Sequence, residues 1–181
     1  MTDALVLDLV EKKLVTDQLV LDVGYDIENL ADPERRKKYR GEVKADRYGR
    51  VVPKHAHGTA NLKKKTSSTS QIMEAVLELY DRIVDENLLI RRVYVTANHA
   101  LDEQSISEET EFTQMDLFTD YQAVAEEQEA EQEKREKERR LQEAMLSVKK
   151  KYGKNAMLKG TNLQEGATMQ ERNNQIGGHH V

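Results

Sequence analysis

Residues 55–97 carry the clearest fold signal in the chain and read HAHGTANLKKKTSSTSQIMEAVLELYDRIVDENLLIRRVYVTA. In residues 55–66 small and apolar side chains alternate with polar ones, which is the period of a half-buried strand. Ser68 followed by Gln71 resembles a capping box, and apolar residues then repeat at helical spacing to about Asn87. Residues 88–97 alternate again. The segment therefore predicts a strand, a helix and a second strand.

Two further elements are predicted before this segment. Residues 3–13 place apolar side chains at helical spacing behind Thr2 as an N-cap, and residues 17–25 alternate as a strand. The order helix, strand, strand, helix, strand predicts a small α+β sandwich with two helices on one face of an antiparallel or mixed sheet. The polar residues 26–54 show no clear period and predict an elongated loop or a protruding hairpin.

The sheet face away from the helices is predicted to be polar and cationic. The covered face would hold Leu19, Leu21, Leu62, Val93 and Val95. Hydroxyls, amides and Lys or Arg heads position a protein on nucleic-acid phosphates without reading sequence. An ordinary solvated sheet face is the alternative interpretation. The opposite face would present Thr59, Asn61, Lys63, Lys65, Arg92, Tyr94 and Thr96, and with their neighbours the candidate DNA-binding residues are Thr59, Asn61, Lys63, Lys64, Lys65, Arg91, Arg92 and Tyr94.

Composition limits the class of protein. The chain has 181 residues, a net charge of −5 and no cysteine, which excludes a disulfide scaffold, thiol catalysis and a cysteine zinc site. Residues after Met1 lack the pattern of a signal peptide and no apolar run reaches membrane-spanning length, so we expect a cytoplasmic protein without a membrane partner. The charge is segregated, because residues 33–66 hold 12 bases and 3 acids whereas residues 101–133 hold 12 acids and neither Lys nor Arg. The net charge therefore does not argue against nucleic acid.

The predicted organisation has four parts. A long helix is expected after the linker because Glu, Gln, Lys, Arg and Ala dominate without a breaker. Pairs such as Glu133 with Lys137 and Glu136 with Arg140 favour a solvated helix over a coiled coil. Leu141, Met145 and Val148 form a short apolar stripe, Gly153 is a C-cap, and the tail is expected to become ordered only on binding. The parts are a DNA-binding domain over 1–100 with a basic insertion at 26–54, an acidic linker over 101–120, the charged helix over 121–152 and a polar tail over 153–181.

The acidic linker contains the pentapeptide Gln114-Met115-Asp116-Leu117-Phe118. Large apolar side chains in a short polar segment are most simply explained by a partner's pocket, with the amide of Gln114 at its mouth. The alternative is that they pack back onto the domain. The pentapeptide resembles the sliding-clamp-binding motif of bacterial DNA polymerases and repair proteins, in which a glutamine precedes a Leu-Phe pair.

Residues 57–69, the helix that follows and Leu89-Ile90-Arg91-Arg92-Val93 resemble the little-finger domain of Y-family translesion DNA polymerases of the UmuC-like ImpB/MucB/SamB group. Residues 151–155 and 176–179 are similar to the C-terminal segment of one bacterial branch. The resemblance implies a domain that grips template–primer DNA by its backbone, a tether to the bacterial sliding clamp at Gln114 to Phe118, and a role in damage tolerance during the SOS response.

Two departures from the family pattern shape the expected activity. The family's polymerase activity lies in a palm whose carboxylates hold two metal ions, and no such segment precedes Met1. We therefore expect a fragment or truncated reading frame that binds DNA and the clamp but does not polymerise, with magnesium needed only in the palm and no cofactor or catalytic residue in this chain. The family's little finger also begins with a strand before its first helix, so an unpaired sheet edge predicts weaker stability or self-association.

Two alternatives stay open and a third is disfavoured. The chain could be a non-enzymatic adaptor that works through the linker motif and the charged helix. A zinc site is disfavoured, because neither His55 with His57 nor the pair at 179–180 has an obvious third ligand. Tyr39 and Tyr48 in the basic insertion fit either base stacking or a solvated loop.

Overall fold

The computed structural model describes residues 1–106 and 121–175, with the helix backbone alone described at 121–128. The chain divides into two compact units. The first unit comprises Met1–Val6 and Leu14–Glu103, and the second comprises Leu7–Lys13 and Gln104–Val181. The motif at 114–118 and the histidine pair at 179–180 lie outside the described residues.

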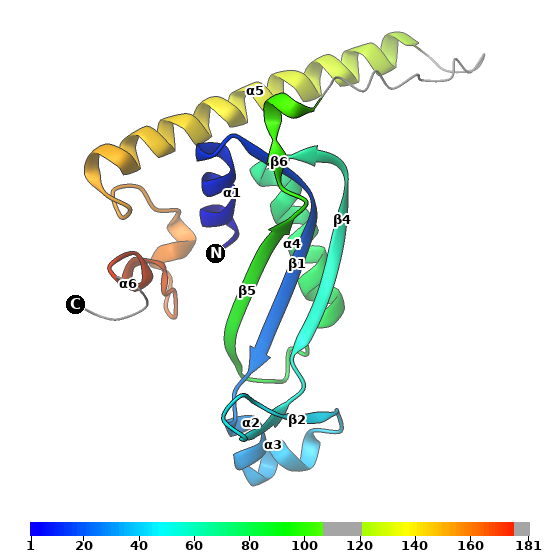
Figure 1. The fold of residues 1–181 in the computed structure, drawn as a ribbon, viewed down its shortest axis with the longest axis vertical. Helices are drawn as coiled ribbons and strands as arrows, with labels where there is room; N and C mark the ends of the chain where they lie inside the picture. The colour runs from blue at the N-terminus through cyan, green and yellow to red at the C-terminus, as the bar shows by residue number, and fades with distance from the viewer. Residues whose placement is uncertain (107–120, 176–181) are drawn as a thin grey trace. The chain divides into compact units, whose positions relative to one another are not determined.

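An antiparallel sheet forms the centre of the first unit. Its order is β4–β1–β5, with β1 (Leu14–Tyr25) between β4 (Ala56–Thr66) and β5 (Ile90–Asn98). Because β4 and β5 are both antiparallel to β1, the helix α4 (Thr69–Ile83) must cross the sheet to connect them, and Figure 1 shows it behind the strands. The predicted α+β fold with an antiparallel sheet is confirmed.

Helix α4 begins where the sequence predicts. Ser68 is its N-cap, and the Ser68 hydroxyl accepts a hydrogen bond from the backbone N–H of Gln71 at 3.4 Å. The helix ends at Ile83, earlier than the predicted Asn87. The hydroxyl of Tyr25 accepts a hydrogen bond from the N–H of Asp85 at 2.9 Å, which stabilises the extended chain beyond the helix. Burial raises the pKa of that Tyr25 hydroxyl.

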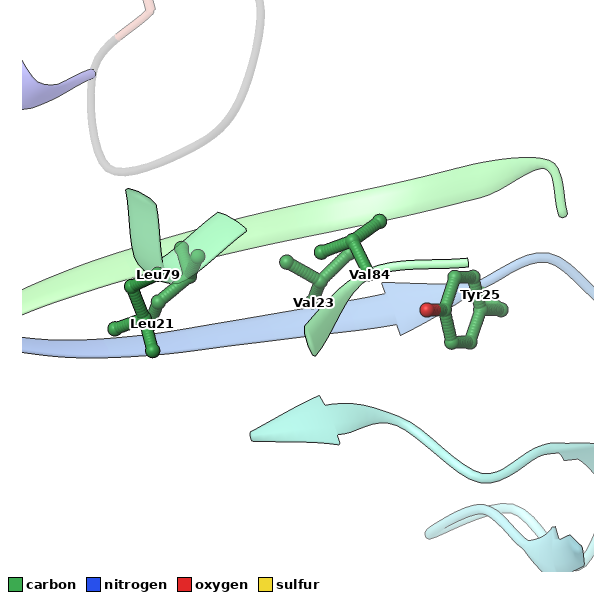
Figure 2. Packing of buried hydrophobic residues seen from close by; sticks show 5 residues of the cluster. All are labelled: Leu21, Val23, Tyr25, Leu79 and Val84. Carbon is green, nitrogen blue, oxygen red and sulfur yellow. The ribbon is translucent and has the colours of Figure 1, made fainter. Parts of the chain in front are cut away.

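The core of the first unit lies between β1 and α4. Leu21 and Val23 of β1 point toward Leu79 and Val84, as Figure 2 shows. Tyr25 closes the same cluster at the end of the strand. Leu21, Val93 and Val95 belong to this cluster and Leu19 is fully buried, as the sequence predicts, whereas Leu62 is only half-buried and is not part of the cluster.

The predicted first helix is α1 (Thr2–Glu11), in which Val6 is fully buried. Thr2 is the first helical residue rather than the cap, because the N–H of Ala4 donates to the carbonyl of Met1 at 3.0 Å. Strand β1 starts at Leu14, three residues before the predicted boundary at 17.

The basic insertion at 26–54 is more structured than a loop. The predicted hairpin is present, but two short helices precede it. The carboxylate of Asp32 accepts hydrogen bonds from the N–H groups of Glu34 at 2.8 Å and Arg35 at 3.1 Å, which lowers the pKa of Asp32. With Pro33 at N1, this N-cap is a helix-start signal that the sequence prediction did not use. The elements are α2 (Glu28–Ala31), α3 (Pro33–Lys38), β2 (Val43–Ala45) and β3 (Val51–Pro53).

The sheet also extends past the predicted start of the linker at residue 101. After β5 the backbone of His99 turns with a φ of 51°, and β6 (Leu101–Asp102) pairs with the beginning of β1. A 3₁₀ turn at Glu103–Ser105 follows. The ring Nδ1 of His99 lies 2.9 Å from the Asp17 carboxylate and supports the turn.

The second unit contains the predicted charged helix as α5 (Tyr121–Tyr152). Glu133 pairs with Lys137 at 3.2 Å and Glu136 with Arg140 at 3.3 Å, as the spacing predicts. The predicted apolar stripe begins on the wrong residue, since Leu141 is 61% exposed whereas Gln142 is buried.

The C-terminal end of α5 is also predicted correctly. Gly153 has a φ of 94° and its N–H donates to the carbonyl of Lys149 at 2.9 Å, which is a left-handed C-cap. The tail was expected to become ordered only when it binds a partner. In the structure, residues 154–175 already include a 3₁₀ turn at Gly160–Leu163 and α6 (Met169–Asn173). Across the described ranges, no helix has the length and apolar character to cross a membrane.

Candidate nucleic-acid interface

The strand register defines one polar face of the sheet, called here the open face. Leu21 of β1 lies opposite Gly58 of β4 and Val95 of β5 on the covered face. A Cβ at Gly58 would lie 2.9 Å from Cδ1 of Leu79, so α4 packs directly on the strand backbone. The alternate residues form the open face, and they are Gln18, Val20, Asp22 and Gly24 of β1, His57, Thr59 and Asn61 of β4, and Arg92, Tyr94, Thr96 and Asn98 of β5.

A row of three amides crosses one end of the open face. Gln18 stands opposite both Asn61 and Asn98. Its Nε2 donates to Oδ1 of Asn61 at 3.0 Å, and its Oε1 accepts from Nδ2 of Asn98 at 3.0 Å. These bonds fix the three side chains across all three strands. Alternation in the sequence identifies Asn61 as a candidate but not Gln18 and Asn98, because their alignment depends on register between distant strands.

Arg92 is fixed against the other end of the open face. Its side chain crosses Gly24, where a Cβ would lie 2.9 Å from Cγ of Arg92. The guanidinium carbon is 5.7 Å from the ring centroid of Tyr94, a cation–π distance, and Tyr94 is 53% exposed. The glycine thus permits a cation to lie along the sheet beside an accessible aromatic ring.

An acidic residue lies in the middle of the open face. The carboxylate of Asp22 is 3.3 Å from Nδ1 of His57 and 3.7 Å from Nε2 of His55. A carboxylate repels phosphates, so the centre of the face is polar rather than cationic. Within 1–106 and the described part of the second unit, no group of three or more His, Cys, Asp or Glu residues has a metal-holding arrangement.

The lysines at 63–65 lie on an irregular part of β4. Asn61 is opposite Gln18 and Thr66 is opposite Thr16, so four residues of β4 face a single residue of β1. The simple alternation that placed Lys63 and Lys65 beside Asn61 therefore breaks after Asn61. All three lysines are exposed, and they form a cationic bulge, Lys63, Lys64 and Lys65, at the amide end of the open face.

Arg91 lies apart from the other candidates. It sits at a register shift between β1 and β5, and its guanidinium is 3.9 Å from the Asp26 carboxylate. Of the remaining candidates, Thr59, Asn61, Arg92 and Tyr94 share the open face. Four of the eight candidate residues therefore lie together on the open face, and the three lysines among the eight lie at one end of it.

Comparison of the chain with protein-family models, with curated proteins and with solved structures found no match.

Proposed function

We propose that this chain is the DNA-binding and sliding-clamp-binding C-terminal part of an error-prone translesion DNA polymerase, with a little-finger-like domain. The observation that carries the proposal is the division of the sheet into a face covered by α4 and an open face of amides, hydroxyls and Arg92. Such groups position a protein on DNA through phosphate and sugar contacts.

The distribution of charge on the open face favours backbone contact at its two ends. The lysine bulge lies near Thr16, and Arg92 lies opposite Gly24 toward the other end of β1. Between them the amide row and the threonines offer uncharged hydrogen-bonding groups, with Asp22 as the single acid. A duplex backbone crossing the sheet would meet cations at both ends and, between them, uncharged donors and the Asp22 carboxylate.

DNA binding that depends on these cations is the first test. We expect the Lys63→Ala, Lys65→Ala, Arg92→Ala triple variant to weaken binding to a blunt duplex. The slope of log affinity against log salt should also fall, by about one for each phosphate that the variant no longer neutralises. Fluorescence anisotropy at several salt concentrations measures both quantities. Gly24→Ala is expected to act in the same direction as Arg92→Ala, because the new methyl displaces the Arg92 side chain.

Lys134→Ala provides the matched control, since it removes an exposed cation of α5. Equal affinity and an equal salt slope for the triple variant and this control would contradict the proposed DNA face. Such a result would favour the adaptor that works through the linker motif and the charged helix.

Clamp binding is tested separately at the linker motif. Gln114→Ala or Phe118→Ala is expected to reduce retention on an immobilised bacterial sliding clamp by at least about tenfold, because pocket-filling anchors dominate peptide interfaces. Phe112→Ala, which removes the chain's other phenylalanine, is the control and should be retained. Unchanged retention of the Phe118 variant would exclude the tether.

A further inference from the structure

We propose that the basic insertion at 26–54 is a second nucleic-acid site, specific for a single strand, in which Tyr48 stacks on an unpaired base and the surrounding cations contact phosphates. This inference rests on the proposed function in one respect, which is that the single strand leaves a duplex bound on the open face. The insertion lies beyond the end of β1 at the foot of the sheet in Figure 1.

Only a minority of the insertion's cations form ion pairs with the acids of α3 and the hairpin described in the structure. Glu34 contacts Lys37 at 3.1 Å, Asp46 contacts Arg50 at 2.6 Å, and Glu42 contacts Lys54 at 2.7 Å. The hydrogen bonds from Arg50 and Lys54 lower the pKa values of Asp46 and Glu42. Six exposed cations form no ion pair within 4.0 Å of a described residue, although Arg35 and Lys38 also help to lower the pKa of Asp32 and Lys44 that of Glu42. The six are Arg35, Arg36, Lys38, Arg40, Lys44 and Arg47.

Tyr48 stands at the tip of the hairpin and is 80% exposed. The turn around it is fixed, because the Asp46 carboxylate accepts hydrogen bonds from the N–H groups of Tyr48 at 2.8 Å and Arg50 at 2.9 Å. The Arg50 guanidinium carbon lies 5.2 Å from the Tyr48 ring centroid. An exposed ring beside an arginine, in an insertion with more cations than acids, has the features that bind single-stranded nucleic acid.

Tyr39 shows that this exposure is particular to Tyr48. The Tyr39 hydroxyl donates to the carbonyl of Glu42 at 2.6 Å, and the ring lies against Gly41, where a Cβ would be 2.6 Å from Cζ of Tyr39. Tyr39 therefore holds the loop between α3 and β2, and Tyr48 is the aromatic residue of the insertion that is presented to a ligand.

The insertion is held firmly to the sheet. Asn29 is fully buried and bonds to the backbone before β5, donating to the carbonyl of Leu89 at 2.9 Å and accepting from its N–H at 2.8 Å. From Thr16, near the lysine bulge, to Tyr25, where the insertion begins, β1 covers about 30 Å at the usual rise per residue. The insertion is therefore far from the lysine bulge and continues the nucleic-acid footprint beyond the Arg92 end of the open face.

The chain contains no tryptophan, so Tyr48→Trp introduces a single stacking reporter. Titration of the full chain with a short oligothymidylate is expected to quench this fluorescence saturably, with an affinity that falls as salt rises. Tyr152→Trp is the matched control, because Tyr152 is 67% exposed and has Lys151 at 5.2 Å from its ring centroid. Equal quenching in the two variants, or quenching by anionic vesicles but not by the oligonucleotide, would overturn the proposal.

Affinity for DNA with and without a single-stranded overhang separates this site from the open face. An overhang is expected to raise the affinity for DNA above that for a blunt duplex, and Tyr48→Ala should reduce this gain by about tenfold. Tyr48→Ala should leave blunt-duplex binding unchanged, and Tyr48→Phe should keep the gain. Arg92→Ala should weaken blunt-duplex binding and leave quenching of the Tyr48→Trp reporter intact. An overhang effect that Tyr48→Ala does not change would contradict the single-strand site even if the open face binds duplex.

Discussion

Leu79→Ala is expected to lower the free energy of unfolding of the first unit by about 2–5 kcal/mol, the range for truncating a buried leucine. Leu79 is 1% exposed and packs with Leu21 and Val23 between α4 and β1. Because Gly58 lets the helix approach the backbone of β4, neighbouring side chains cannot easily fill the space left by the missing methyl groups.

Leu77→Ala is the matched control, since Leu77 lies in the same helix but is 54% exposed. Its expected cost is within about 0.5 kcal/mol, as for most surface substitutions. Amide hydrogen exchange of β1 reports on the first unit alone, which matters because α5 contributes much of the helical signal of the whole chain. Similar protection of β1 in the two variants would show that α4 does not cover the sheet as described.

The elements with strong local signals could be predicted from the sequence. Helix α4 has both a side-chain cap at Ser68 and an apolar stripe, and each is formed by residues close in the chain. Helices α2 and α3 were missed because they are too short to show an apolar period, although Asp32 and Pro33 mark the start of the second. The re-entry of the chain at β6 depends on a positive φ at His99, a conformation uncommon for a residue other than glycine.

The sequence predicts which side chains share the open face but not which of them are neighbours on it. Alternation assigns Thr59, Asn61 and Arg92 to the side away from the core, because a strand's side chains have a period of two. Alternation cannot give register, so the amide row through Gln18 and the position of Asp22 between the ends emerge only from the paired strands. The same limit explains Lys63 and Lys65, since the irregularity that displaces them is set by pairing with β1.

Asn29→Ala is expected to cost about 1–3 kcal/mol, because it removes the hydrogen bonds of a fully buried amide and leaves the N–H of the half-buried Leu89 without its acceptor. Asn29→Asp is expected to be no better. It keeps an acceptor for that N–H but places a carboxylate against the carbonyls of Asp26 and Leu89, which the Asn29 amide now meets as a donor at 2.9 Å each. Asn87→Ala is the control, because Asn87 is exposed and its side chain donates a hydrogen bond to nearby Asp85.

The consequence of the Asn29 change for the insertion can be measured with the Tyr48→Trp reporter. Removal of the Asn29 bonds breaks a fixed link between α2 and the start of β5, so the steady-state anisotropy of the reporter is expected to fall and its affinity for oligothymidylate to weaken. The carbonyl of Leu89 still accepts the N–H of Asp26 at 2.8 Å, so the insertion should stay attached while its orientation loosens. If Asn29→Ala and Asn87→Ala give the same anisotropy and the same stability, the buried amide is not what orients the insertion, and the six cations outside the ion pairs would then act without a fixed geometry.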